Sequence, residues 1–255
     1  MWLFISPSNY SEMRTKIASC VFVFSLIELF VFAQTSSSFS QILLKLSFNY
    51  TFTVAGVELY IAYLYIPVLL AVLENIFNLH DYTQRLFHIR ERFEGKYMLS
   101  QYADCLGFDG VSGSETYNAY KDCPKLKKVF LSHFYSYASS VNPKIDKHYI
   151  TSTLDAWCWF WIVWDSSIIC ILMLIMGILL PVISEIRVSS RFLIMMLVLL
   201  LASSVLEMLI MRECKKRSET EIKAVFNLDV KDEKTETTET TETIKALLKN
   251  ALYHQ

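Results

Sequence analysis

The fold is decided by residues 156–183, which read AWCWFWIVWDSSIICILMLIMGILLPVI. This stretch contains no Lys, Arg or His and a single acid, Asp165. A helix needs roughly 20 apolar residues to cross a hydrocarbon layer about 30 Å thick. The stretch therefore predicts a membrane-spanning helix, and its tryptophans, which prefer the bilayer boundary, mark one end of that helix.

Three other stretches have the same character. They are residues 17–33, 52–77 and 192–211, and none of them contains Lys, Arg or His. The composition agrees with a membrane protein, since 53% of the residues are hydrophobic and the mean hydropathy is +0.34. Only 6 Gly and 5 Pro are present, too few for the many turns of a barrel. The sequence predicts an all-α, polytopic membrane protein with four transmembrane helices.

The Lys and Arg residues set the expected orientation. Residues 1–16 contain 2 of them, residues 78–155 contain 10 and residues 212–255 contain 9. Positive residues favour the cytoplasmic side, so both termini and the central segment are expected there. The predicted organisation is an N-terminal segment with helices one and two (1–77), a cytoplasmic helical hairpin (78–155), helices three and four (156–211) and a cytoplasmic tail (212–255).

Within these segments the pattern gives further expectations. Apolar residues at helical spacing in 39–46 predict a helix on the membrane surface, and Pro124 begins another helix. Residues 108–116 form an expected loop. The acidic Thr-Glu stretch 231–243 predicts a disordered linker in the tail. It leads to a short amphipathic helix at 244–252. Three alternatives stay open for this helix: it docks on a partner, it docks on the chain's own cytoplasmic domain, or it is a solvated end of the tail.

The acids within the apolar stretches are the best functional clue. An ionisable group in a span costs at least about 2.5 kcal/mol on insertion scales, so each acid needs an explanation. At about 1.5 Å per residue, Glu28 and Glu58 are expected at similar height near the outer edge, and Asp165 and Glu207 nearer the inner edge. Their functional interpretation is an acid-lined cation or proton path, completed by oligomerisation. The alternative is that each acid is protonated or bonded to a nearby hydroxyl and holds helices together.

Motifs for enzymatic chemistry are missing. The sequence contains no Gly-rich phosphate loop, paired-Cys zinc pattern or nucleophile elbow, so we expect no enzyme, no cofactor and no metal site. His80 and His88 are expected to be solvated. Basic residues near the membrane predict binding of anionic lipid or of a protein partner, with nucleic acid unsupported by any motif. These residues are Arg85, Arg90, Arg92, Lys125, Lys127, Lys128, Arg212, Lys215, Lys216 and Arg217.

The layout of four spans, a small cytoplasmic helical unit and no catalytic motif resembles the membrane sensors and effectors of bacterial anti-phage systems. This resemblance implies a homo-oligomeric sensor or pore-forming effector in the bacterial inner membrane, working with a soluble partner. Two other classes stay open. One is a cation or proton channel or transporter with an acid-lined path, and the other is a non-conducting membrane scaffold for a cytosolic partner.

Overall fold

A computed structural model of the chain describes residues 6–35, 37–54, 57–108, 110–183, 188–231 and 235–253. The chain divides into two compact units. The apolar unit contains residues 11–80 and 158–211. The polar unit contains residues 6–10, 81–157 and the segment from 212 onward. Both units are helical, and one small hairpin belongs to the apolar unit.

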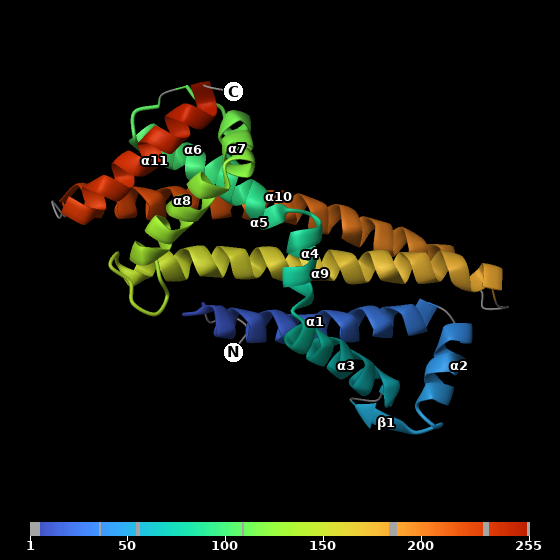
Figure 1. Cartoon of the computed structure of the whole chain (residues 1–255). Coiled ribbons are helices and arrows are strands. Elements are labelled where there is room, and N and C mark those ends of the chain that lie inside the picture. The colour runs from blue at the N-terminus through green and yellow to red at the C-terminus, as the bar shows by residue number, and fades with distance from the viewer. Residues whose placement is uncertain are drawn as a thin grey trace. The chain divides into compact units, whose positions relative to one another are not determined.

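The elements follow one another with short connections (Figure 1). They are α1 Tyr10–Thr35, α2 Ser37–Leu46, β1 Thr51–Val54, β2 Val57–Tyr60, α3 Ala62–Phe77, α4 Leu79–Leu86, α5 Ile89–Phe93, the π-helix η2 Glu94–Met98, α6 Leu99–Cys105, α7 Gly113–Asp122, α8 Pro124–Tyr137, α9 Lys147–Ile183, α10 Ser190–Lys231 and α11 Thr235–Tyr253.

Three of these helices, α1, α9 and α10, are long and apolar enough to cross a membrane. A fourth crossing exists if α3 and α4, which are separated by a break, together form one span. The all-α prediction is confirmed, and the predicted stretches 17–33, 156–183 and 192–211 all lie in helices. The helices suit a polytopic membrane protein with three spans or four.

The predicted helix over residues 52–77 is wrong at its start. β1 and β2 pair antiparallel, with Thr51 opposite Tyr60 and Thr53 opposite Glu58. Residues 55 and 56, which the prediction also covers, lie outside the described residues. Thr, Val, Phe and Tyr dominate both strands, and such residues favour extended backbone. α3 begins only at Ala62 and has 16 residues, so it is about 24 Å long and too short to cross a 30 Å layer alone.

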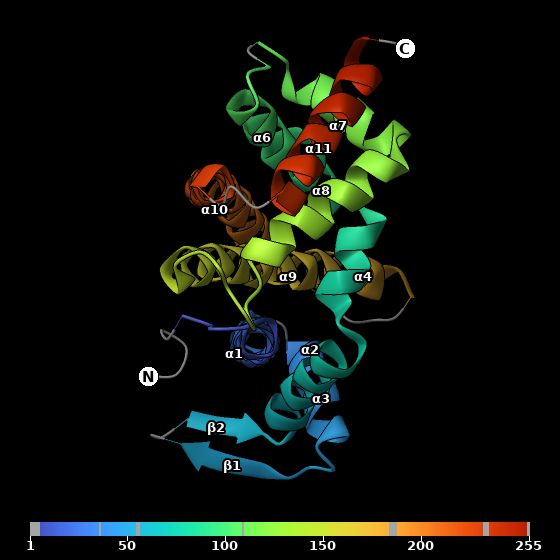
Figure 2. The same ribbon diagram turned by 60° about the vertical axis from the view of Figure 1, so that its left-hand side comes forward.

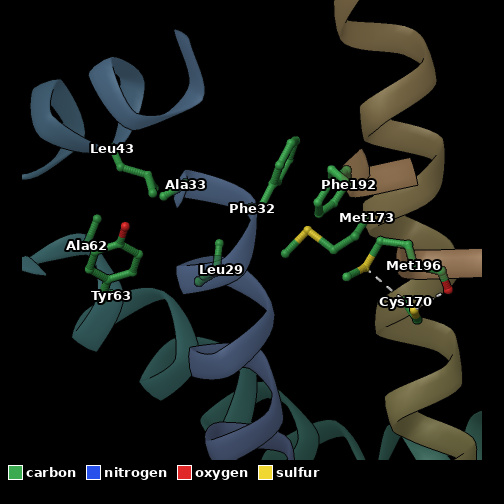
Figure 3. Packing of buried hydrophobic residues seen from close by; sticks show 10 residues of the cluster. All are labelled: Leu29, Phe32, Ala33, Leu43, Ala62, Tyr63, Cys170, Met173, Phe192 and Met196. Carbon is green, nitrogen blue, oxygen red and sulfur yellow. Dashed lines mark hydrogen bonds between the residues drawn. The ribbon is translucent and has the colours of Figure 1, made fainter. Parts of the chain in front are cut away.

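The core of the apolar unit joins helices that are far apart in the sequence. Phe32 of α1 stacks on Phe192 of α10 with ring centroids 4.1 Å apart. Cys170 of α9 donates to the carbonyl oxygen of Met196 at 3.4 Å (Figure 3). Leu43 is 1% exposed and fixes α2 to the same cluster. These contacts bring α1, α2, α3, α9 and α10 together around one buried cluster.

The prediction of a disordered linker over residues 231–243 is wrong for the residues that the structure describes. α10 continues through Lys231, and residues 235–253 form α11, while residues 232–234 lie outside the described residues. The continuation is stable because Cys214, Ile222 and Val225, at helical spacing, are all fully buried. In α11 the apolar face predicted for the tail helix is covered, since Ile244 and Leu248 are also fully buried. α11 packs on α7 and α8 within the polar unit, so the tail helix docks on the chain's own domain (Figure 2).

Candidate functional site

A buried acid–base pair lies at the carboxyl end of α3. Glu74 Oε1 and His80 Nδ1 are 2.6 Å apart, and both side chains are almost fully buried. The chain brings the two residues together by breaking the helix at Asn78, whose φ of +49° lies in the left-handed region. The His80 ring also lies 6.0 Å from the Trp161 ring of α9. The expectation that His80 is solvated is therefore wrong.

Asp165 of α9 lies near this pair. It follows Trp161, whose ring lies 6.0 Å from the His80 ring, by four residues, so the two side chains share one face of α9. The Asp165 side chain is buried at 5% exposure. Among the described residues, no donor lies within hydrogen-bonding reach of its Oδ2 atom. Burying a carboxyl without a hydrogen-bond donor is costly, so its place here needs an explanation. We call Glu74, His80 and Asp165 the buried acid cluster.

Glu28 of α1 is a third buried carboxyl of the apolar unit. It is 8% exposed, and no hydrogen-bond partner of its Oε2 atom is found in the described part of the chain. Ser25, which the sequence offers as a neighbour, donates instead to the carbonyl oxygen of Val21 at 2.6 Å. A hydrogen bond from Ser25 therefore does not account for the buried Glu28 carboxyl.

The acids expected in an outer and an inner layer have different environments in the structure. Glu58 lies in strand β2, opposite Thr53, so the expectation that it lies on a helix next to Glu28 is wrong. Glu207 of α10 accepts a hydrogen bond from Ser167 Oγ at 2.6 Å. That hydrogen bond ties α9 to α10, which is the helix-holding role expected of a polar group between spans.

Four of the basic residues predicted to bind lipid or a partner are engaged within the polar unit. Arg90 Nε lies 2.7 Å from Glu94 Oε1, and Arg90 also donates to the Tyr135 hydroxyl at 2.9 Å. Lys127 Nζ lies 2.8 Å from Glu91 Oε1, and this bond lowers the pKa of the Glu91 carboxyl. Lys215 Nζ lies 3.9 Å from the Tyr97 ring centroid.

The last of the four, Arg217, donates to the carbonyl oxygen of Ser152 at 2.7 Å. Its side chain also lies 3.6 Å from Asp155 Oδ2. These four cations stabilise the fold of the polar unit. The other six remain exposed, and they are Arg85, Arg92, Lys125, Lys128, Arg212 and Lys216.

A pocket of about 530 Å³ lies in the polar unit between the α4–η2 segment and α8. Its acids have hydrogen-bond partners within the unit. Asp81 accepts from the Tyr10 hydroxyl at 2.8 Å, and Glu94 accepts from the Tyr120 hydroxyl at 2.6 Å. The formal charges of the acids that line the pocket are balanced by an equal number of Arg and Lys residues. Within the described ranges, no group of three or more His, Cys, Asp or Glu side chains could hold a metal ion.

Long apolar helices with buried carboxyls between them are what a multi-pass membrane protein with an internal polar site requires. The model of the YmfE protein family matches residues 9–236, which is most of the chain. The protein belongs to the YmfE protein family. No curated protein and no solved structure matches the chain.

Proposed function

We propose that this member of the YmfE protein family is a homo-oligomeric membrane sensor or pore-forming effector whose ion path passes the buried carboxyls of the apolar unit. The observation that carries the proposal is the Asp165 carboxyl, which is buried in an apolar helix near the Glu74–His80 pair. A carboxyl of this kind at membrane depth is costly and marks ion or proton pathways more often than it stabilises a fold.

The buried acid cluster supports movement of protons or small cations. His80 Nδ1 lies 2.6 Å from Glu74 Oε1, a distance over which a proton can pass. The buried Asp165 carboxyl lies on α9, and Glu28 of α1 adds a third buried acid. A proton or cation that enters the apolar unit therefore meets carboxyl groups on α1, α3 and α9.

Conduction requires more than one copy, because so few helices leave little room for a water-filled path. The apolar part of α10 supports assembly in a bilayer, since its large side chains point outward. Leu201 is 68% exposed and Ile194 is 61% exposed. Such a face contacts lipid in a monomer and can contact neighbouring copies in an oligomer.

The proposed membrane orientation follows from the distribution of Lys and Arg, and the proposed cellular location follows from the arrangement of spans and polar segments. Positive residues in the central segment and after Met211 favour a cytoplasmic location for the polar unit and both termini. The layout resembles that of anti-phage membrane effectors, which work in the bacterial inner membrane with a soluble partner. On this proposal, activation is toxic to the host cell, whereas a housekeeping channel or transporter conducts without toxicity.

The test is ion flux from liposomes that contain the purified protein, with proton and potassium leakage measured separately. We expect Asp165→Asn and Glu28→Gln to reduce the leakage of the unaltered protein by about tenfold or more, the scale of one lost charge interaction of roughly 1.4 kcal/mol. Glu207→Gln is the matched control. Glu207 is also an acid in an apolar stretch, but its carboxyl already accepts a hydrogen bond from Ser167.

Equal leakage in Asp165→Asn, Glu28→Gln and Glu207→Gln would overturn the acid-lined path. A different result is that the unaltered protein and the variants are all folded and oligomeric and yet show no leakage, even with cell extract added. That result would favour a non-conducting scaffold for a cytosolic partner.

A further inference from the structure

The segment between α1 and α3 forms a separate surface of the apolar unit. It consists of α2, a tight corner at residues 47–50 and the β1–β2 hairpin (Figure 2). We propose that this segment rests on the bilayer–water boundary and that Phe48 and Tyr50 anchor it in the lipid headgroup region. The inference requires only a bilayer around the apolar helices, so it is independent of the proposed ion path.

The hairpin cannot lie in the hydrocarbon. Within the described residues it is a sheet of two strands, so the outer edge of each strand carries backbone groups that the sheet does not pair. An unpaired backbone N–H or C=O costs several kcal/mol in hydrocarbon, which excludes open sheet edges from it. β1 and β2 therefore lie in the headgroup region or in water.

The chain position of α2 favours the headgroup region. α1 ends at Thr35 and α2 begins at Ser37, so α2 starts where the first apolar helix reaches its boundary. With 10 residues, α2 is about 15 Å long and cannot cross the bilayer. Its Leu43 side chain is buried in the unit, while Lys45 and Leu46 are exposed. A short amphipathic helix of this kind lies in the plane of the interface.

The corner after α2 is built to hold aromatic side chains outward. Phe48 and Asn49 have φ values of +53° and +61°, a region that costs a bulky residue roughly 1–2 kcal/mol. Hydrogen bonds fix the corner in spite of this cost. The Ala62 amide donates to Ser47 Oγ at 2.9 Å, and the Tyr65 hydroxyl donates to the Leu46 carbonyl oxygen at 2.8 Å.

The side chains at this corner suit lipid headgroups. Phe48 is 82% exposed and Tyr50 is 67% exposed, which is unfavourable for aromatic residues in water. Tyr is enriched at the boundary of the bilayer, where its ring meets acyl chains and its hydroxyl meets water. Phe contributes to the apolar face that segments lying in the interface bury at the headgroup–acyl boundary. The nearby Lys45 ammonium complements lipid phosphate. Lipid therefore explains the chemistry of this corner.

The experiment measures the depth of a nitroxide label at Phe48→Cys in liposomes. The half-buried cysteines are first removed by Cys105→Ser and Cys123→Ser, since the remaining four thiols are buried. Collisions with oxygen, which dissolves in hydrocarbon, are compared with collisions with a water-soluble nickel chelate. Leu201→Cys on the exposed face of α10 is the hydrocarbon control, and Val141→Cys, in an exposed loop of the polar unit, is the water control.

We expect an oxygen-to-nickel ratio at Phe48→Cys severalfold above that at Val141→Cys and severalfold below that at Leu201→Cys. The Tyr50→Cys reporter alone, which leaves Phe48 in place, serves if Phe48→Cys fails to fold. Adding Phe48→Ser to this reporter should shift it toward the water value. A ratio equal to the Val141→Cys value would overturn the proposal. A label shielded from both reagents would also overturn the proposal if its spectrum showed spin–spin broadening. Loss of that broadening on dilution with unlabelled protein would show that a second copy of the chain covers the corner.

Discussion

Glu74 Oε1 lies 2.6 Å from His80 Nδ1, with side-chain exposures of 3% and 2%. Removing one member of a buried pair leaves the other without compensation, and the usual loss is about 3 kcal/mol or more. We expect His80→Phe, which keeps an aromatic ring beside Trp161, to lower the free energy of unfolding by about 3 kcal/mol. Denaturant unfolding in detergent micelles, followed by circular dichroism, measures this loss.

The double variant Glu74→Gln/His80→Phe supplies the control for that loss. It removes the acid as well, so we expect it to be more stable than His80→Phe alone by at least about 1 kcal/mol. The losses of unfolding free energy in Glu74→Gln and in His80→Phe are also measured separately. If the loss in the double variant equals their sum, a direct interaction between the two side chains is contradicted.

Gly113 begins α7 against the backbone of η2. A Cβ atom at this position would lie 2.6 Å from the carbonyl oxygen of Lys96, and backbone cannot move as easily as a side chain. Overpacking of this kind costs about 1–3 kcal/mol. We expect Gly113→Ala to lower the melting temperature of the protein in micelles, whereas Ser114→Ala, at an exposed position of the same helix, should leave it nearly unchanged. Equal melting temperatures of the two variants would show that α7 does not approach η2 this closely.

The basic residues of the polar unit should separate into two groups by experiment. Lys125 and Lys128 are exposed, and in the proposed setting each contributes about 1 kcal/mol to binding of anionic lipid. We expect Lys125→Gln/Lys128→Gln to retain less phosphatidylglycerol in native mass spectrometry with unchanged stability. Lys127→Gln should instead lower stability, because Lys127 is bound to Glu91. Unchanged lipid retention in the double variant would exclude this surface as the lipid site.

The apolar helices could be predicted because their signal is summed over some twenty residues. Residues 156–183 lie in one helix in the structure, as hydropathy alone predicts. Hydropathy cannot separate a strand from a helix, and for this reason it places residues 52–60 in a predicted span. The β-branched and aromatic residues of Thr51–Val54 contain the missing signal.

The buried acid cluster could be predicted only in part. Asp165 stands out in the sequence, but Glu74 and His80 are six residues apart, a spacing that does not place two side chains together on a continuous helix. Only the left-handed residue Asn78 brings them into contact. The start of α7 could have been found within the expected loop 108–116, since Ser112 and Glu115 form a capping box.

Glu221 should make the stability of the protein depend on pH. It lies ten residues beyond Met211 in the polar part of α10, and burial raises the pKa of its carboxyl from 4.5 to about 7. The folded state therefore binds this proton more tightly than the unfolded state does. The resulting destabilisation is absent below about pH 4.5, grows as the pH rises and is complete above about pH 7.

The interval between these two pKa values corresponds to about 3 kcal/mol, at roughly 1.4 kcal/mol per pH unit. Because other groups also titrate, the informative quantity is the difference between the unaltered protein and Glu221→Gln, measured by denaturant unfolding from pH 5 to pH 8. We expect the Gln variant to gain stability relative to the unaltered protein as the pH rises, and to gain nothing further above about pH 7. A difference that does not change with pH would mean that the Glu221 carboxyl is solvated, and the packing of α10 against the rest of the polar unit would then be looser than the buried Cys214, Ile222 and Val225 side chains indicate.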